Sequence, residues 1–152
     1  MAARITRTLS RSINMMWPFF NKSETAKRWP SVSIGDISAT WCANYGWTFV
    51  DPILQVDCNT YDNDEFHESI VTMLPIAREW ISQLASDMLN RVNQYADEAA
   101  LPTNAHDMQG IDLSKLCTEN QIDISYTSDE WADFAINVVI TGGEITDVYG
   151  GD

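Results

Sequence analysis

The sequence predicts an α+β domain in which an antiparallel sheet, made of an N-terminal meander plus C-terminal strands and a hairpin, packs against two amphipathic helices. In two separate parts of the chain, apolar and polar residues alternate at period two, which is typical of strands with one buried face. Between these parts, apolar residues recur every three or four positions, which is typical of helices packed on one side. The length of 152 residues is sufficient for one domain with a hydrophobic core.

The C-terminal segment 131–149 is expected to form a β-hairpin, and it is the strongest structural signal in the chain. Isoleucine and valine alternate with other residues along 136–140, so one face of this strand is apolar. Gly142-Gly143 follows, and two adjacent glycines can supply the positive φ angles of a tight turn. A phosphate-binding loop is the competing interpretation, but such loops lead into a helix, and the residues from Ile145 onward have no helical pattern.

The charge differs sharply between the two ends of the chain. Residues 1–28 hold six Lys or Arg and one Glu, a formal charge of +5, whereas residues 29–152 hold three Lys or Arg and 21 Asp or Glu, a formal charge of −18. The second part would repel nucleic acid and anionic membranes and attract basic partners, although a need for solubility alone explains the same composition. No apolar run approaches the roughly 18 residues that a membrane span needs.

Residues 1–28 are interpreted as a basic flexible arm, and residues 29–152 as a single acidic α+β domain. Within Met1–Met16, three arginines fall on one side of a helical wheel and apolar residues on the other, which is the composition of an organelle transit peptide or a membrane-surface helix. The competing interpretation is that translation begins at Met15 or the methionine after it, which makes the preceding residues extraneous.

Cysteine and histidine content bears on both compartment and chemistry. Cys42, Cys58 and Cys117 are isolated, and an odd number without a CxxC pair fits buried thiols in a reducing compartment better than a secreted disulfide framework. We therefore expect a cytoplasmic protein, or an organelle protein if the arm is a transit segment. A catalytic cysteine would need a base, and His67 and His106 both lack a recognisable context. The sequence predicts no catalytic residues and no cofactor.

The N-terminal part of the domain is predicted to be an antiparallel meander. An edge strand covers residues 32–34, and the aromatic-rich segment 40–50 is interrupted by Asn and Gly, which predicts two strand segments or one bulged strand. Asp51-Pro52 is a turn signal, and residues 53–58 are predicted to form the next strand.

Residues 57–68 resemble a calcium loop in outline, but we interpret them as the start of a helix. The sixth position of a calcium loop requires Gly, and Asp62 stands there instead; a strand rather than a helix also precedes it. In the preferred interpretation Asp62 caps the helix, Glu65 completes a capping box, and Asp64 is favoured by the helix dipole. No metal site is predicted.

Two amphipathic helices are expected next. The first runs from about residue 63 to residue 73, and Pro75 is expected to break or kink the chain before a second helix that reaches about residue 96. An apolar stripe on the second helix is expected to cover one face of the sheet; its residues are Ala77, Trp80, Ile81, Leu84, Met88, Val92 and Tyr95.

The remaining segments complete the predicted sheet. Residues 97–110 are expected to form a polar loop, and residues 112–117 a short helix. Residues 121–127 alternate Ile and Tyr with polar residues, which predicts a strand that pairs with the closing hairpin. Residues 128–133 form an acidic connection between them.

The order of these elements resembles a known group of small bacterial proteins. The stretches DEWADFAINVVI at residues 129–140 and ITDVYGG at residues 145–151 are similar to the C-terminal half of proteins of domain of unknown function 2262 and its relatives. The resemblance covers roughly residues 29–152 and includes the aromatic meander and the central Trp80. It implies an α+β fold and a bacterial cytosolic setting, and it supplies no activity because the family has none assigned.

The leading functional hypothesis is a non-enzymatic acidic binding protein, such as a bacterial immunity protein or an antitoxin-like inhibitor. Its partner would be a basic protein, such as a cognate toxin, because complementary charge accelerates association. Trp131 is attractive as an anchor if it is exposed, since binding hot spots favour Trp; the alternative is that Trp131 is buried and the acids are merely solvated. The residues expected to contact the partner are Asp62, Asp64, Glu65, Asp129, Glu130, Trp131 and Asp133.

Two other hypotheses remain open at this stage. The chain could be a structural subunit of a larger assembly, tethered by its basic arm. It could also be a small enzyme of an unrecognised class, which would require a histidine hydrogen-bonded to an acid inside a cleft. The sequence does not indicate the oligomeric state.

Overall fold

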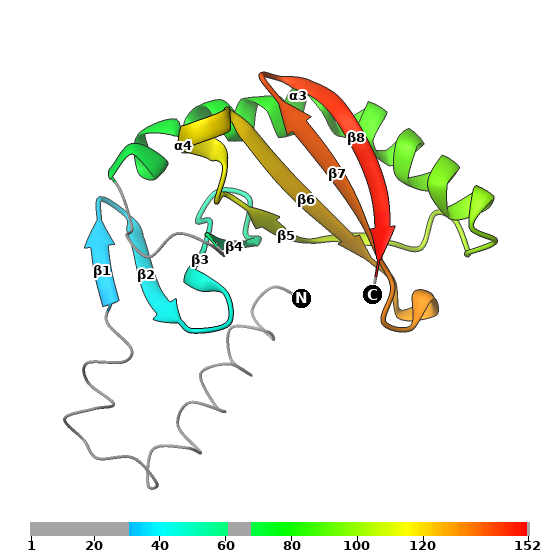
Figure 1. Cartoon of the computed structure of the whole chain (residues 1–152), viewed down its shortest axis with the longest axis horizontal. Helices are drawn as coiled ribbons and strands as arrows, with labels where there is room; N and C mark the ends of the chain where they lie inside the picture. Colours follow the sequence, from blue (N-terminus) through cyan, green and yellow to red (C-terminus); the bar gives the residue numbers. More distant parts are fainter. Residues whose placement is uncertain (1–30, 61–67, 152) are drawn as a thin grey trace, which may run out of the picture.

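The computed structural model describes residues 31–60 and 68–151, and these residues form an α+β fold (Figure 1). Eight strands make one open sheet in which the spatial order follows the chain order, from β1 to β8. All neighbouring strands are antiparallel except β4 and β5, which are parallel. The predicted fold class is confirmed at this level. The predicted arm at residues 1–28 lies outside the described residues.

The predicted N-terminal meander is confirmed. An edge strand, β1 (Ser31–Ile34), pairs with β2 (Ile37–Cys42), and β2 pairs with β3 (Gly46–Val50). The aromatic-rich segment therefore forms two strands joined by a turn, which is the first of the two predicted alternatives. Trp41 and Trp47 lie opposite each other in this hairpin and make an edge-to-face contact with centroids 5.6 Å apart.

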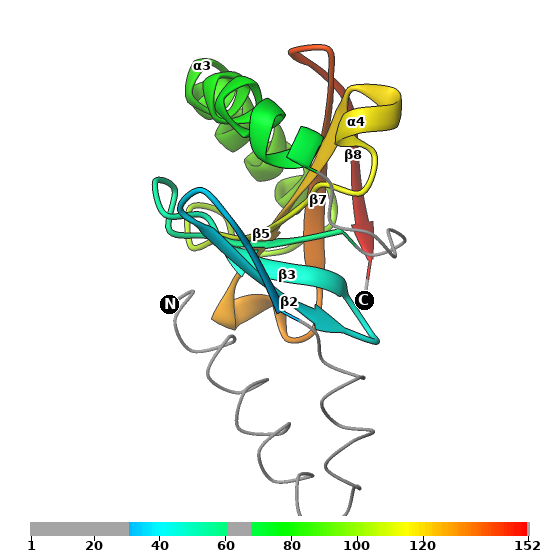
Figure 2. The ribbon, with the colours of Figure 1, turned by 90° about the vertical axis from the view of Figure 1, so that its left-hand side faces the viewer.

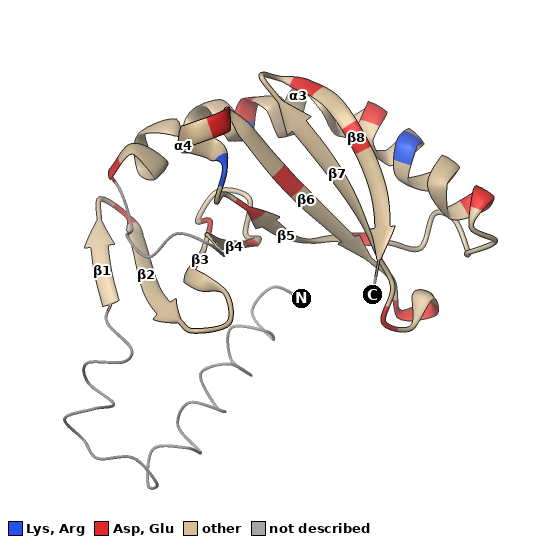
Figure 3. Ribbon diagram, in the orientation of Figure 1, with Lys and Arg blue, Asp and Glu red and all other residues tan. Residues whose placement is uncertain are grey.

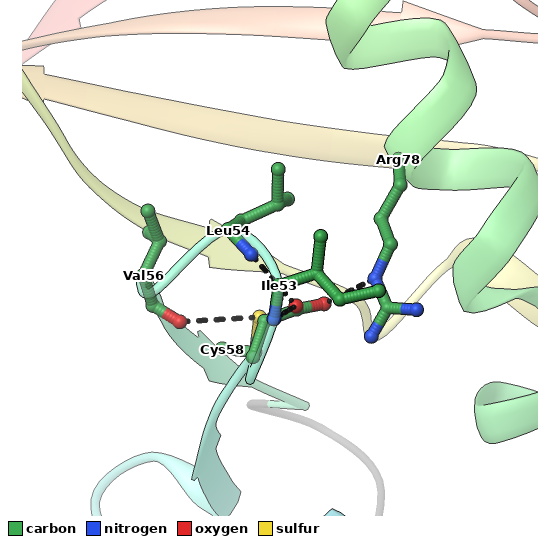
Figure 4. A network of polar contacts seen from close by, with 6 residues as sticks. Ile53, Leu54, Val56, Cys58 and Arg78 are labelled. Carbon is green, nitrogen blue, oxygen red and sulfur yellow. Dashed lines mark hydrogen bonds and ion pairs between the residues drawn. The ribbon is translucent and has the colours of Figure 1, made fainter.

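The predicted strand over residues 53–58 is wrong for most of its length. Strand β4 (Asp57–Asn59) begins only at Asp57, and the preceding residues form a loop around the fully buried Asp51. Asp51 Oδ1 accepts from the N–H groups of Ile53 (2.8 Å) and Leu54 (3.0 Å), and its Oδ2 accepts from Arg78 Nε (2.9 Å). Figure 4 shows Arg78 of the helix reaching this loop. The carboxylate stabilises a local turn, which competes with an extended strand.

The two predicted helices are a single helix in the structure, α3 (Glu68–Glu98), and the predicted break at Pro75 is wrong. Proline removes one helical hydrogen bond and normally disrupts a helix interior. Here Pro75 is exposed, and the helix continues through it. The buried residues on either side of the proline enter the same core and favour a continuous helix; the buried residues of α3 are Ile70, Leu74, Ala77, Ile81, Met88, Val92 and Ala96.

The segment after α3 also departs from the prediction. Strand β5 (Asp107–Asp112) lies where a polar loop was expected to continue, and it contains one fully buried apolar residue, Ile111. The short helix α4 (Leu116–Glu119) begins four residues later than predicted and ends at Asn120, which has a left-handed conformation. A strand with so little apolar alternation is defined by its pairing with β4 and β6 rather than by its own pattern.

The C-terminal strands match the prediction closely. Strand β6 (Gln121–Thr127) pairs with β7 (Ala135–Thr141), which pairs in turn with β8 (Glu144–Gly151). The turn residues Gly142 and Gly143 have φ angles of 60° and 86°, as a tight hairpin turn requires. The turn faces the helix, because the indole of Trp80 lies about 3 Å from the position that a side chain at Gly143 would occupy.

The hydrophobic core lies between α3 and one face of the sheet. Figure 2 shows the helix on one side of the strands, and the buried residues of β6 and β7 point toward it. Tyr126 of β6 donates its hydroxyl hydrogen to Met88 Sδ of α3 at 3.7 Å, which joins the sheet to the helix. On the face of β6 that points away from the core, half-exposed residues alternate with the buried ones.

Candidate functional site

The face of the sheet that points away from α3 carries a line of carboxylates. Along β6, buried isoleucines alternate with half-exposed polar residues, so Asp123 points away from the core. In the observed register, Asp112 of β5 lies opposite Asp123 of β6. Asp123 also lies opposite Val139 of β7, and Val139 lies opposite Asp147 of β8. We call Asp112, Asp123 and Asp147 the acidic row. Figure 3 shows acidic residues on β5, β6 and β8.

Neutral groups donate hydrogen bonds to two carboxylates of the acidic row, Asp123 and Asp112. Asp123 Oδ2 accepts from the hydroxyl of Tyr149 (3.3 Å), and its Oδ1 accepts from Gln121 Nε2 (3.0 Å). Asp112 Oδ1 accepts from the N–H of Ser114 at 2.9 Å. Burial raises the pKa of Tyr149, and the charge of Asp123 raises it further, so this phenol remains a protonated donor. These contacts orient the carboxylates without neutralising their charge.

The described Lys and Arg residues lie on other elements. Arg78 and Arg91 belong to α3, and Lys115 immediately precedes α4. An ion pair joins Arg78 to the buried Asp51. Asp123 and Asp147 accept hydrogen bonds from neutral groups.

Three of the predicted contact residues lie together on an exposed loop. Asp129 and Glu130 belong to the short 3-10 helix η2 (Asp129–Trp131), and Asp133 follows it; all three side chains are exposed. Ser128 caps this turn, because its hydroxyl accepts from the N–H of Glu130 at 3.1 Å. The loop connects β6 to β7 at one end of the sheet (Figure 1), so its acids extend the negative charge beyond the acidic row.

Trp131 is buried, so the alternative in which it forms an exposed anchor is wrong. Only 3% of its surface is exposed, and its Nε1–H donates to the carbonyl of Pro102 at 2.8 Å. Its ring also lies 5.3 Å from the ring of His106. The indole is satisfied within the fold and belongs to the core. The other predicted contact residues, Asp62, Asp64 and Glu65, lie outside the described residues.

The acidic row and Tyr149 are features that the sequence interpretation missed. The alternation in residues 121–127 does place Asp123 on the polar face of its strand, so part of the signal was present. Its alignment with Asp112 and Asp147 depends on the register of three strand pairs, which a single sequence does not reveal. Tyr149 is 43% exposed on the same face and supplies the aromatic group that Trp131 cannot.

The cysteines differ in their surroundings. Cys42 and Cys58 are buried as predicted, whereas Cys117 is exposed. Burial raises the pKa of the Cys58 thiol, and the charges of Asp51 and Asp57 raise it further. Cys58 is therefore held as the neutral thiol, which is the unreactive form.

His106 contacts an amide rather than an acid. Asn93 Oδ1 accepts a hydrogen bond from the backbone N–H of Asn104 (3.0 Å), and it also lies 2.8 Å from His106 Nε2. Because an amide oxygen can only accept, His106 Nε2 is the donor and carries the proton. Among the described residues, no group hydrogen-bonds to the buried Nδ1. Burial lowers the pKa of His106, and the neighbouring Asp107 opposes this shift only in part. His67, the other histidine, lies outside the described residues.

Residues 31–60 and 68–151 contain no cluster of three or more His, Cys, Asp or Glu side chains that could hold a metal ion. Within the same residues, no helix has both the length and the apolar character needed to cross a membrane.

No protein-family model, curated protein or solved structure matches this chain, and the resemblance to domain of unknown function 2262 stays a prediction.

Proposed function

We propose that this chain is a non-enzymatic binding protein that docks a basic protein partner against the polar face of its sheet, in the manner of an immunity protein or an antitoxin-like inhibitor. The observation that carries the proposal is the acidic row, a line of three carboxylates aligned across β5 to β8 on the polar face of the sheet. Its occupant would be a protein surface rich in Lys and Arg.

The charge balance of the described residues supports a basic partner. Three of them are Lys or Arg, whereas seventeen are Asp or Glu: three within residues 31–60 and fourteen within residues 68–151. A field of this sign accelerates the approach of a basic protein, with association rates on the order of 10⁸ M⁻¹ s⁻¹ at low salt. The same field makes association depend steeply on ionic strength.

Tyr149 supports the choice of this face over other acidic surfaces. Binding hot spots favour Tyr, Trp and Arg, because a large rigid side chain buries much area at small entropic cost. The Tyr149 ring is partly exposed beside Asp123 and Asp147, so one face offers both an aromatic contact and charge. The loop acids Asp129 and Glu130 would form a charged rim.

The test is a titration of the chain with each basic protein encoded by a neighbouring gene, in which affinity and association rate are measured at two salt concentrations. The face variant combines Asp112→Asn, Asp123→Asn and Asp147→Asn. The control variant makes the same change in net charge on exposed acids elsewhere, with Asp36→Asn, Glu79→Gln and Glu119→Gln. Thermal unfolding shows that both variants fold, and Asp123→Asn alone serves if the triple variant does not.

We expect the face variant to bind at least tenfold more weakly than the wild type, because each removed charge contributes attraction at the interface. The control variant should keep most of the affinity and lose only part of the association rate. An equal loss in both variants, or no binding by any basic neighbour, would overturn the proposal.

A further inference from the structure

We infer that the outer edge of β8, together with the groove between β8 and α3, accepts an extended segment rich in Lys and Arg as a ninth strand. This inference rests on the proposed function, because it identifies the part of a basic partner that this chain recognises. It adds a mode of recognition, β-strand addition, in which backbone hydrogen bonds give affinity and alternate side chains give specificity.

The position and length of β8 make it suitable as a template. It is the last strand in the sheet order, and no strand of the described residues pairs with its outer edge. Its eight residues span about 27 Å, whereas β1 at the opposite edge has four residues. Edge strands are commonly protected by Lys, Pro or a covering element. Strand β8 contains neither Lys nor Pro; its protection consists of its irregular pairing with β7 near Ile140 and of the negative charges of Glu144 and Asp147, which a basic segment would neutralise.

One backbone donor of β8 is already bonded to a side chain rather than to a strand. The N–H of Val148 donates to Asp147 Oδ1 at 2.9 Å. In an antiparallel ladder, alternate N–H groups of an edge strand point outward, where they await a partner strand or water. A carbonyl group of an incoming strand can replace the Asp147 carboxylate as the acceptor of the Val148 N–H. The released carboxylate can then pair with a Lys or Arg of that strand.

A groove runs beside this edge. Two adjoining cavities of about 380 Å³ and 280 Å³ lie between α3 and β8 and share Arg91 and Gln94 in their walls. Alternate side chains of a ninth strand would point into this groove, and the others would point toward the polar face of the sheet. The groove thus gives side chains of an added strand a place to bind.

The charges around the groove identify the occupant. Among the described residues that line it, Arg91 is the one cation, and four are carboxylates: Asp87, Glu98, Glu144 and Asp147. Pairing β8 with β8 of a second copy would bring Glu144 and Asp147 of both chains together, and like charges on adjacent strands are destabilising. A strand carrying Lys or Arg has the opposite charge, so a basic segment of another protein is favoured over a second copy.

The test uses three fluorescent nine-residue peptides with alternating Lys and Val. One is unmodified; the others carry N-methyl groups on every Lys or on every Val, which removes one set of backbone donors without changing the charge. We expect anisotropy titrations to show at least tenfold weaker binding for one N-methylated peptide and nearly unchanged binding for the other. Only one set of N–H groups can face β8, because successive groups point to opposite edges.

Variants of the protein locate the peptide. Glu144→Lys with Asp147→Lys should weaken the unmodified peptide at least tenfold, whereas the control pair Asp36→Lys with Glu119→Lys, equal in net charge, should have a much smaller effect. Equal affinities of all three peptides, or no binding of any, would overturn strand addition and leave docking on the sheet face intact. Sedimentation showing that the wild type dimerises, with loss of the dimer in the β8 variant, would overturn the choice of occupant.

Discussion

The two ends of the sheet are stabilised in different ways. At the N-terminal end, β1 to β4 have three to six residues each, and the loop into β4 depends on the buried ion pair of Asp51 and Arg78. At the C-terminal end, β6 to β8 have seven or eight residues in a nearly regular ladder with an apolar inner face. The apolar inner face of these strands packs in the core, and their outer face carries charge. The candidate site lies on the outer face of the longest and most regular strands.

The largest effect should follow from breaking the N-terminal end. Asp51→Ala removes the acceptor of two backbone N–H groups and leaves Arg78 without its carboxylate. Breaking a buried pair in this way costs about 3–5 kcal/mol, because the remaining charge stays largely buried. The free energy of unfolding, measured by urea denaturation, reports the loss. Asp36→Ala, at an exposed position, should change stability by less than about 0.5 kcal/mol. A loss below about 1 kcal/mol in Asp51→Ala would show that this ion pair does not organise the loop.

The next largest effect tests the packing of the C-terminal end. A side chain at Gly150 would overlap the rings of Phe134 and Tyr95, whereas the space beside Gly151 is open within 4 Å. Gly150→Ala should therefore destabilise the protein by about 1–3 kcal/mol through overpacking, and Gly151→Ala should be close to neutral. Thermal unfolding of this adjacent pair makes the comparison. Similar stabilities of the two variants would mean that β8 is not packed as tightly against α3 as the structure indicates.

A smaller effect concerns His106, which precedes β5 and whose ring contacts Tyr126 of β6 and Trp131. Its pKa is lowered in the folded state from the ordinary value of 6.5, so the unfolded chain binds a proton at a higher pH than the folded one. The stability that depends on neutral His106 is fully present above pH 6.5 and is lost as the pH falls toward the folded pKa. His106→Gln should remove this part of the pH dependence. Urea midpoints at pH 7 and pH 5 test it, and parallel losses in wild type and variant would contradict it.

The smallest expected effect has the opposite sign. Asp112 and Asp123 lie directly opposite each other on β5 and β6, where like charges are destabilising. Asp123→Asn keeps an acceptor for Tyr149 and removes one charge, so it should raise the free energy of unfolding by about 0.2–1 kcal/mol. The gain should shrink at high salt, because screening already weakens the repulsion. A lower free energy of unfolding at low salt would mean that the Asp123 carboxylate stabilises the fold, which would contradict this prediction.

The same contrast explains which elements the sequence could predict. Strand β6 was predicted with its observed ends, and the glycine turn of the hairpin was correct, because long strands with one apolar face display their period in the sequence. Strand β4 has three residues and β5 has one fully buried apolar residue, so neither shows a period. The break predicted at Pro75 was wrong because burial on both sides of an exposed proline outweighs the lost hydrogen bond.

The candidate site was predictable only in part. The loop acids Asp129, Glu130 and Asp133 are exposed as a contact surface requires, because they follow a strand in a polar connection. The buried state of Trp131 depends on a hydrogen bond to Pro102, which is distant in the sequence. The acidic row depends on strand register, which is set by pairing across the whole sheet.

Carboxylate footprinting of the complex tests the central claim most directly. The chain is treated with a carbodiimide and an amine, alone and with the basic partner from the titration, and the labelling of each acid is measured by mass spectrometry. We expect labelling of Asp123 and Asp147 to fall severalfold in the complex, while labelling of Asp36 and Glu79 stays unchanged. Protection of Asp36 and Glu79, with Asp123 and Asp147 still fully labelled, would contradict docking on this face of the sheet.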